Sequence, residues 1–401
     1  MKKILFIVLL LLITITPVKA LPLPVEVTAD SVLLMNLDTE QIIYTKNPDK
    51  KQILASLTKV MTAYTVIQNV ENLNKKVTIT EEDIYGLWGF TCIGLEVGDK
   101  VSYMDLLYGA ILTSGADATQ ALAYHTAGST EKFVKLMNEE AKKLGLRNTN
   151  FEDSYGGHDD NVSTAREFAK LLKECLKNQT FKKVFTTYQK KLSNDLVAFN
   201  GTRGYSIFHG LDENLITGSK SGYTPEAGLL LASTATINDT NYMLIVMKCD
   251  INDYMSTHVL ESYRIYDYIS NLRFATKTVI RKDEIIKRIP VENGTINEYV
   301  VMAEKDIKVN LPEELLNKVE LDYHIATKIT PANKVGDNLG YIDIIVEGEI
   351  INTYNIYLRD EIFTYPKKTN DPTIIIIIAI VFFALVIMCT NLFQVKKRKF
   401  K

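Results

Sequence analysis

The sequence predicts an α+β fold: an antiparallel sheet flanked by helices, followed by a small all-β domain and a C-terminal transmembrane helix. Three observations lead to this class. Strand-like segments stand at both ends of roughly the first 270 residues, with helical segments between them. Short alternating strands fill the region after residue 277, and an uncharged apolar run lies near the C-terminus. Segregation of strands and helices along the chain favours an antiparallel sheet over βαβ units.

The first domain is expected over residues 21–275. It begins with a hairpin, residues 27–36 and 41–44, in which β-branched and aromatic residues flank a polar turn. Apolar residues at helical spacing then predict helices over residues 55–70, 103–113, 116–127, 130–144 and 164–177. Thr164 and Glu167 have the spacing of a capping box. The remaining expected elements are strands at 206–217, 228–235 and 242–248 and a helix over 256–270.

The second domain is expected over residues 277–363. Short alternating runs such as 278–280, 298–302 and 341–346 predict strands, and turn signals at residues 292–294 and 335–337 separate them. No cluster of catalytic residue types lies in this region. Residues 364–372 form a polar linker, and we interpret the small β domain as a spacer.

The two ends of the chain are interpreted as targeting segments. Lys2 and Lys3 precede a short apolar run, and Val18 and Ala20 stand at the −3 and −1 positions of a cleavage site after Ala20. Residues 1–20 are therefore typical of a cleaved signal peptide. Residues 373–395 carry no charge and are long enough to span a bilayer as a helix. The basic tail, residues 396–401, is expected to stay in the cytoplasm. These features predict a single-pass protein of the cell membrane with its catalytic domain outside the cytoplasm.

Charge and cysteine content exclude other classes. The formal net charge is −2 and basic residues gather at the two ends, which leaves the central part acidic. Nucleic-acid binding is therefore not expected. Four cysteines in 401 residues are too few for a disulfide scaffold. Cys92, Cys175 and Cys249 lie outside the predicted span and allow at most one disulfide, and they show no metal-ligand spacing.

The chemistry-bearing residues form an ordered triple. Ser56 and Lys59 make an S-x-x-K motif at a predicted helix start, Ser114 follows, and Lys220-Ser221-Gly222 enters the strand-rich end. Residues at i and i+3 share a helix face, so Lys59 can take the proton of the Ser56 hydroxyl. A lysine acts as a base only when its ammonium form is disfavoured, by burial or by a second cation such as Lys220. A second S-x-x-K, Ser129 to Lys132, has charged neighbours and is interpreted as a solvated face.

Two further features of the triple suit acyl transfer. The backbone N–H of Ser56 at a helix start, and a strand N–H just after Gly222, can stabilise an oxyanion. Glycine at position 222 allows a ligand to lie close to the strand. Lys220 can in addition hold a substrate carboxylate. Taken together and in this order, the motifs predict a catalytic site.

The motifs resemble those of class A β-lactamases and penicillin-binding proteins, which share S-x-x-K, a second serine motif and K-T-G. The segments 55–64, 98–101 and 220–228 narrow the resemblance to the low-molecular-mass penicillin-binding proteins that are serine-type D-alanyl-D-alanine carboxypeptidases. The resemblance covers residues 25 to about 272. It extends to the architecture, because these enzymes often carry a signal peptide, a following β domain and a C-terminal membrane anchor.

The resemblance implies a role for each motif residue. Ser56 would form an acyl-enzyme with peptidoglycan stem peptides ending in D-Ala-D-Ala, with Lys59 as its base and Ser114 as the proton relay to the leaving amine. Lys220, Ser221 and Gly222 would bind the substrate, and the N–H groups of Ser56 and Tyr223 would hold the oxyanion. β-Lactams would be covalent inhibitors. No metal or organic cofactor is implied.

Three departures from the family pattern leave alternatives open. Ala116 stands where the second motif usually has asparagine, and its missing amide would slow acylation or alter substrate choice. Ser221 replaces the commoner threonine, and no arginine lies in residues 250–254, where some relatives place one. We therefore weigh a D,D-carboxypeptidase against a detuned membrane-anchored cell-wall binding protein and against a D,D-endopeptidase acting on cross-links.

Overall fold

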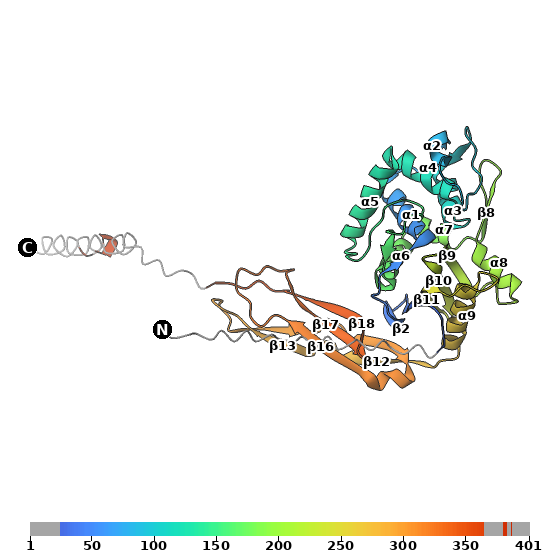
Figure 1. The fold of residues 1–401 in the computed structure, drawn as a ribbon. Helices are drawn as coiled ribbons and strands as arrows, with labels where there is room; N and C mark the ends of the chain where they lie inside the picture. Colours follow the sequence, from blue (N-terminus) through green and yellow to red (C-terminus); the bar gives the residue numbers. More distant parts are fainter. Residues whose placement is uncertain (1–24, 365–379, 383–385, 387–401) are drawn as a thin grey trace, which may run out of the picture. The chain divides into compact units, whose positions relative to one another are not determined.

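The computed structural model describes residues 25–364, 380–382 and 386, and its first part is built on a five-stranded sheet. The strands are β1 (Ser31–Asn36), β2 (Gln41–Lys46), β9 (Ile216–Thr224), β10 (Gly228–Ile237) and β11 (Thr240–Cys249). Their order is β2-β1-β11-β10-β9, and every neighbouring pair is antiparallel. The predicted hairpin and antiparallel sheet are thus confirmed. Strand β9 lies at one edge of the sheet, where a ligand can approach its backbone (Figure 1).

Helices flank this sheet, as the α+β class requires. The longer ones are α1 (Thr58–Asn69), α3 (Tyr103–Ile111), α4 (Ala116–Ala127), α5 (Thr130–Lys143), α6 (Ala165–Lys177), α7 (Gln179–Phe185), α8 (Gly201–Phe208) and α9 (Thr257–Ser270). The short helices and strands are η1 (Ala55–Leu57), α2 (Glu81–Ile84), β3 (Gln52–Ile53), β4 (Lys76–Thr78), β5 (Lys100–Ser102), β6 (Val162–Ser163), β7 (Gln189–Lys191) and β8 (Val197–Phe199). All five helices predicted between residues 55 and 177 are present.

The pleat of the sheet shows which face of β9 carries the Lys220 side chain. Ser233 on β10 contacts the hydroxyl of Tyr266 on α9, so this face of the strand lies against α9. Ser233 is paired with Ser219 on β9, and the preceding residue on β10, Ala232, is paired with Lys220. Because successive side chains on a strand alternate between faces, Lys220 points to the opposite face. Residues of η1 lie close to β9 there.

The strand predicted over residues 206–217 is wrong for most of its length. Residues 201–208 form α8, and β9 begins only at Ile216. Tyr, Ile and Phe at positions 205, 207 and 208 favour a strand, and two glycines disfavour a helix. The helix forms because the Asn200 side chain accepts a hydrogen bond from the Thr202 N–H, and Ser206 is buried against the hydroxyl of Tyr263. Capping and burial outweigh local propensity here.

Residues 274–357 form β-strands apart from one 3₁₀ segment and the connecting turns. The elements are β12 (Phe274–Ile280), β13 (Ile285–Pro290), β14 (Glu298–Met302), β15 (Ile307–Pro312), η2 (Glu313–Lys318), β16 (Val319–Ile325), β17 (Asn338–Val346) and β18 (Glu349–Tyr357). They form the sheets β12-β15, β13-β14 and β16-β17-β18. The expected all-β character is confirmed.

Two compact units divide the chain at different places from the domain boundary expected near residue 276. The first unit takes the described residues up to Lys282 together with Glu304–His324 and Tyr341–Tyr354. The second takes Asp283–Ala303, Ile325–Gly340 and the described residues from Asn355 onward. All of β15 and most of β16, β17 and β18 therefore belong to the same unit as the five-stranded sheet. The boundaries 21–275 and 277–363 stay a prediction.

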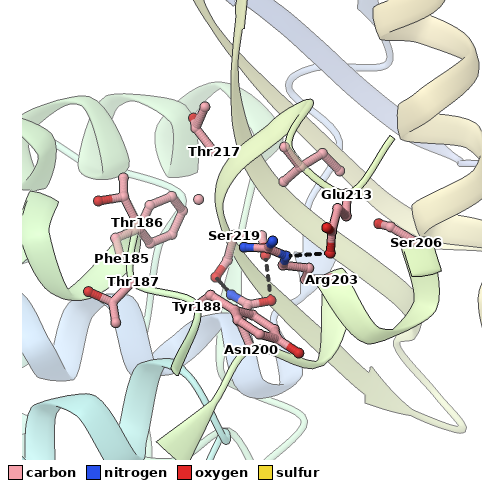
Figure 2. Close-up of a pocket in the computed structure, with 12 residues that line it drawn as sticks. Phe185, Thr186, Thr187, Tyr188, Asn200, Arg203, Ser206, Glu213, Thr217 and Ser219 are labelled. Atoms are coloured by element: carbon pink, nitrogen blue, oxygen red, sulfur yellow. Dashed lines mark hydrogen bonds and ion pairs between the residues drawn. The ribbon is translucent and has the colours of Figure 1, made fainter. Parts of the chain in front are cut away.

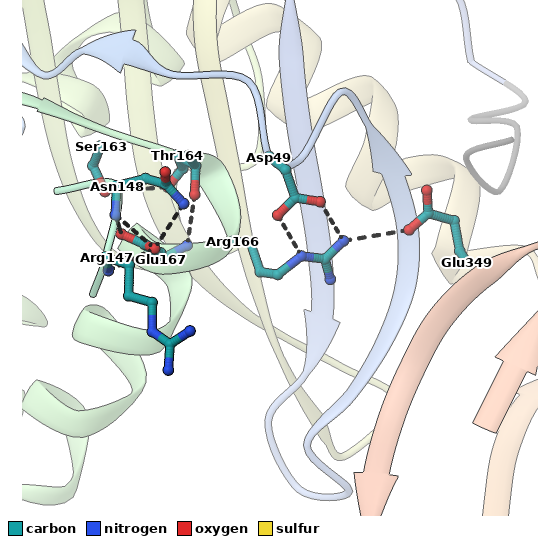
Figure 3. A network of polar contacts seen from close by, with 8 residues as sticks. All are labelled: Asp49, Arg147, Asn148, Ser163, Thr164, Arg166, Glu167 and Glu349. Carbon is teal, nitrogen blue, oxygen red and sulfur yellow. Dashed lines mark hydrogen bonds and ion pairs between the residues drawn. The ribbon is translucent and has the colours of Figure 1, made fainter. Parts of the chain in front are cut away.

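An ion-pair network within the first unit explains part of this grouping (Figure 3). The Arg166 guanidinium on α6 lies 2.8 Å from Asp49 Oδ1 and 3.4 Å from the Glu349 carboxylate on β18. The Glu349 side chain is buried, and burial raises the pKa of its carboxyl although Arg166 opposes this. Because the Glu349 carboxylate is buried, removal of its arginine partner would be costly.

The capping box predicted at the start of α6 forms only in part. Thr164 caps the helix by accepting a hydrogen bond from the Glu167 N–H at 3.1 Å. The Glu167 carboxylate instead accepts hydrogen bonds from the N–H groups of Arg147 and Asn148, so it anchors the preceding loop rather than the Thr164 backbone (Figure 3).

The predicted terminal segments cannot be compared with the structure. Residues 1–20 and 396–401 lie outside the described residues, as do residues 365–372 of the linker and 373–395 apart from 380–382 and 386. Among the residues that are described, no helix has the length and apolar character needed to cross a membrane.

Candidate active site

Ser56 and Lys59 meet at the junction of η1 and α1. The Lys59 ammonium group lies 2.9 Å from Ser56 Oγ, as their i, i+3 spacing predicts. Lys59 is almost fully buried beneath the partly exposed Ser56. Burial lowers the pKa of Lys59 to about 8, although Asp153, Cys92 and Asp117 act in the opposite direction. An amine with this pKa is neutral in a substantial fraction of molecules near pH 8 and can accept the serine proton.

The backbone around the nucleophile is strained and tightly enclosed. Ala55, directly before Ser56, has a φ of 43°, a value that residues with a side chain rarely adopt. Gly156 lies against it with a φ of 90°, and a Cβ at this glycine would be 1.9 Å from the Ala55 carbonyl oxygen. Only glycine fits this position, because any side chain would push the backbone away from the serine.

Ser114 and Lys220 form the second polar pair. The Lys220 ammonium donates to Ser114 Oγ at 2.9 Å and to the Ser221 carbonyl at 2.7 Å. Ser114 has a φ of 64° in the turn between α3 and α4, a second strained residue at a predicted motif. Burial and the neighbouring charge of Lys59 lower the pKa of Lys220 well below its usual range. The fold thus brings together two side chains that are 106 residues apart in the sequence.

Strand β9 lies directly against the nucleophile segment. A Cβ at Gly222 would lie 3.2 Å from the Ser56 nitrogen and 3.2 Å from the Leu54 carbonyl oxygen. The Gly222 backbone therefore runs close beside η1. Tyr223, the next residue, is exposed at the strand edge, and Ser221 is half-buried.

Ala116 is fully buried at the first position of α4. The neighbouring Asp117 does not replace the missing amide, because its carboxylate accepts hydrogen bonds from the N–H groups of Ile93, Gly94 and Leu95 at 2.9–3.0 Å. Asp117 thus holds the 93–95 loop beside the site.

Sequence reasoning missed one partner of the base. The Tyr155 carbonyl accepts a hydrogen bond from the Lys59 ammonium at 2.6 Å. A main-chain oxygen carries no residue signature, and Tyr155 lies 96 residues from Lys59. The only sequence signal is the turn-forming run Asp153-Ser154-Tyr155-Gly156-Gly157.

The three cysteines of the described chain are free thiols. Cys175 and Cys249 are buried, whereas Cys92 is exposed beside the site. The possible disulfide is therefore absent among them. The second S-x-x-K motif lies at the start of α5, where Ser129 caps the helix and Lys132 is exposed to solvent, as expected.

A separate pocket lies at the beginning of β9 (Figure 2). Asn200 donates to the Ser219 carbonyl at 3.1 Å and accepts from the Ser219 hydroxyl at 3.1 Å. Arg203 in this pocket pairs with Glu213 at 3.0 Å and covers the ring of Tyr188. None of the predicted motif residues lines it. Asn200 in this pocket instead holds Ser219, the strand residue that precedes Lys220.

This geometry coincides with a match to a family model described as D-alanyl-D-alanine carboxypeptidase, which covers residues 17–250. The chain belongs to this family. A second model, described as the C-terminal domain of penicillin-binding protein 5, matches residues 274–363. The resemblance inferred from the three motifs is confirmed by these two matches, which together extend over most of the chain.

Individual relatives agree with the family assignment. The chain is 25% identical over 356 residues to D-alanyl-D-alanine carboxypeptidase DacF of Bacillus subtilis, covering 85% of this chain and 89% of the relative. It is 32% identical over 237 residues to a D-alanyl-D-alanine endopeptidase of Pseudomonas aeruginosa, covering 58% and 74%. Among solved structures, penicillin binding protein 5 from Haemophilus influenzae is 26% identical with a TM-score of 0.66, covering 85% and 99%.

Proposed function

We propose that this chain is a serine-type D-alanyl-D-alanine carboxypeptidase that removes the terminal D-alanine from peptidoglycan stem peptides. The observation that carries the proposal is the pair of contacts at the site: Lys59 with Ser56 at 2.9 Å and Lys220 with Ser114 at 2.9 Å. A hydroxyl in contact with a buried amine is the arrangement that an activated serine nucleophile needs. The family assignment supports this reaction class.

Acylation begins with neutral Lys59, whose lone pair takes the Ser56 hydroxyl proton while Oγ attacks the carbonyl carbon of the penultimate D-alanine. The negative charge that develops on the carbonyl oxygen is met by the N–H groups of Ser56 and Tyr223, which Gly222 brings together by its close approach. The tetrahedral intermediate then breaks its C–N bond. Ser114 relays the proton that Lys59 has accepted to the departing nitrogen, and free D-alanine leaves.

Lys220 and Ser221 supply recognition of the substrate end. The terminal carboxylate of D-Ala-D-Ala carries one negative charge. Lys220 is buried, and its hydrogen bonds within the described residues go to the Ser114 hydroxyl and the Ser221 carbonyl, neither of which is charged. A bound carboxylate would favour the charged form of Lys220. Water then attacks the Ser56 ester and Lys59 accepts its proton. The C–O bond to Ser56 breaks, Lys59 returns the proton to Ser56 Oγ, and a stem peptide shorter by one residue is released.

The test measures D-alanine release from diacetyl-Lys-D-Ala-D-Ala by the full chain in detergent. Wild type is compared with Ser56→Ala and with Ala116→Asn, and labelled penicillin is used in parallel to detect acylation. Release by wild type that disappears in Ser56→Ala supports the proposal. A folded wild type that neither releases D-alanine nor takes up label on Ser56 contradicts it.

Ala116 provides the reason to keep a second candidate. If wild type takes up labelled penicillin but releases D-alanine only after Ala116→Asn, the chain is a detuned cell-wall binding protein. The named endopeptidase relatives motivate a further assay, in which cleavage of cross-linked muropeptide dimers is compared with tripeptide hydrolysis. Faster cleavage of the dimers would favour the endopeptidase alternative.

The membrane tether is proposed from the sequence alone. Residues 1–20 direct export, residues 373–395 anchor the chain, and residues 396–401 stay in the cytoplasm. Fractionation of cells that express the full chain or a chain ending at residue 371 tests this. Equal membrane association of both chains contradicts a C-terminal anchor.

A further inference from the structure

A single carboxylate organises the loop that follows Phe151. Asp153 Oδ1 accepts hydrogen bonds from the N–H groups of Tyr155 and Gly156 and from the Asn161 side chain. Asp153 Oδ2 accepts two more, from the N–H groups of Gly157 and His158 at 2.8 and 2.7 Å. Hydrogen bonds to an ionised carboxylate are about twice as strong as neutral ones. Five donors on one side chain therefore fix the loop backbone.

This loop is pressed against both the nucleophile and the base. The Ser154 carbonyl accepts from Thr62 on α1 at 2.5 Å, and the Tyr155 carbonyl accepts from Lys59 at 2.6 Å. Gly156 lies against the Ala55 carbonyl, next to Ser56. On its outer side the Tyr155 ring contacts Phe90 edge-on, with ring centroids 5.0 Å apart. Any movement of the Asp153 turn is thus transmitted to the Lys59 amine.

The Tyr155 carbonyl is the contact that fixes the position of the Lys59 amine. Within the described residues, Lys59 Nζ donates hydrogen bonds to Ser56 Oγ and to the Tyr155 carbonyl. The first is the group that reacts, so the second is the contact that fixes the amine. We propose that Asp153 is a positioning residue that holds the Tyr155 carbonyl against the Lys59 amine. This inference rests on the proposed role of Lys59 as the general base.

The charges around Lys59 give the direction of the effect. Asp153 is the largest influence that opposes burial and raises the pKa of Lys59, followed by Cys92 and then Asp117 on α4. Lys220 on β9 is the neighbouring cation. Replacing Asp153 by asparagine removes a negative charge and destabilises the ammonium form. The pKa of Lys59 then falls, and the neutral base is present at lower pH.

The test is the pH dependence of acylation by a fluorescent penicillin, measured on the full chain in detergent. Asp153→Asn should move the acid limb of the second-order rate constant to lower pH by on the order of one unit. It should also lower the maximal rate, because an asparagine side chain offers one acceptor oxygen where the carboxylate offers two. The matched control is Asp159→Asn, which removes a carboxylate from an exposed position of the same loop and should leave both quantities unchanged.

A second readout does not require activity. Hydrogen exchange of a peptide spanning residues 155–161 should accelerate in Asp153→Asn and not in Asp159→Asn, because the N–H groups of Gly157 and His158 lose their acceptor. A folded Asp153→Asn chain with wild-type rate, acid limb and exchange overturns the inference. Failure of wild type to acylate at all would instead overturn the proposed function, and the exchange experiment would still decide the positioning role of Asp153.

Discussion

Substitution of Gly156 by alanine should damage stability and catalysis together. Two separate costs can be assigned from the structure. The φ of 90° places the new side chain in a left-handed conformation, which costs about 1–2 kcal/mol. The new Cβ would also lie 1.9 Å from the Ala55 carbonyl oxygen, a backbone atom that cannot rotate away. Overpacking of this kind costs about 1–3 kcal/mol.

The combined loss in the free energy of unfolding is about 2–5 kcal/mol, which corresponds to a fall in Tm of about 5–15 °C. Because the displaced atoms adjoin Ser56, acylation should slow at least about tenfold, as misplacement of reacting groups predicts. Thermal unfolding and the rate of penicillin labelling measure the two effects on the same preparation.

The matched control separates the two costs. Gly210→Ala has a similar φ of 66°, yet nothing lies within 4 Å of its Cβ position. Gly210→Ala should therefore lose only the conformational part, about 1–2 kcal/mol, and should acylate at the wild-type rate. If Gly156→Ala is no less stable than Gly210→Ala and acylates normally, the contact between the 153–161 loop and Ala55 has been misjudged.

Three further predictions address the base, a supporting carboxylate and the ion-pair network. Because the pKa of Lys59 is about 8, the acylation rate should rise with pH up to about pH 8 as the amine becomes neutral. Lys59→Met should reduce this rate by about 10²–10⁴. An acylation rate that is independent of pH between about 6 and 8 would refute Lys59 as the base. Asp117→Asn should lower the free energy of unfolding by about 1–3 kcal/mol, because the N–H groups of the 93–95 loop lose charged acceptors, and unchanged denaturant midpoints would contradict this. Arg166→Leu should cost about 3 kcal/mol or more by leaving Glu349 buried without its partner, whereas the double variant Arg166→Leu with Glu349→Leu should regain most of that loss in the same unfolding assay.

Local signals in the sequence were sufficient for most helices. The prediction for residues 116–127 coincides with α4, which ends where Gly128 adopts a φ of 79°. Periodic apolar residues and a terminating glycine act within a few residues, so no distant contact was needed to recognise them. The same local reasoning failed over residues 206–217, where burial of Ser206 against α9 overrides the strand propensity of its neighbours.

The candidate site shows the same division. Ser56 and Lys59 are one helical turn apart, so their contact follows from the sequence once a helix start is recognised. The contact of Lys220 with Ser114 was not predicted, because 106 residues separate them and only the fold brings them together. The Tyr155 carbonyl could not have been found, because its function belongs to the backbone and every residue carries that group.

The sequence by itself thus indicated the reaction class and predicted Ser56 as the nucleophile, Lys59 as its base and Lys220-Ser221-Gly222 as the strand motif, because residue types at a fixed spacing can be recognised without a structure. The tertiary structure alone decided the environment of those groups. Burial lowers the pKa of Lys59, the Asp153 turn places a carbonyl on it, and Gly156 fits against Ala55. Desolvation and close packing depend on atoms that are distant along the chain, and only the folded backbone brings them together.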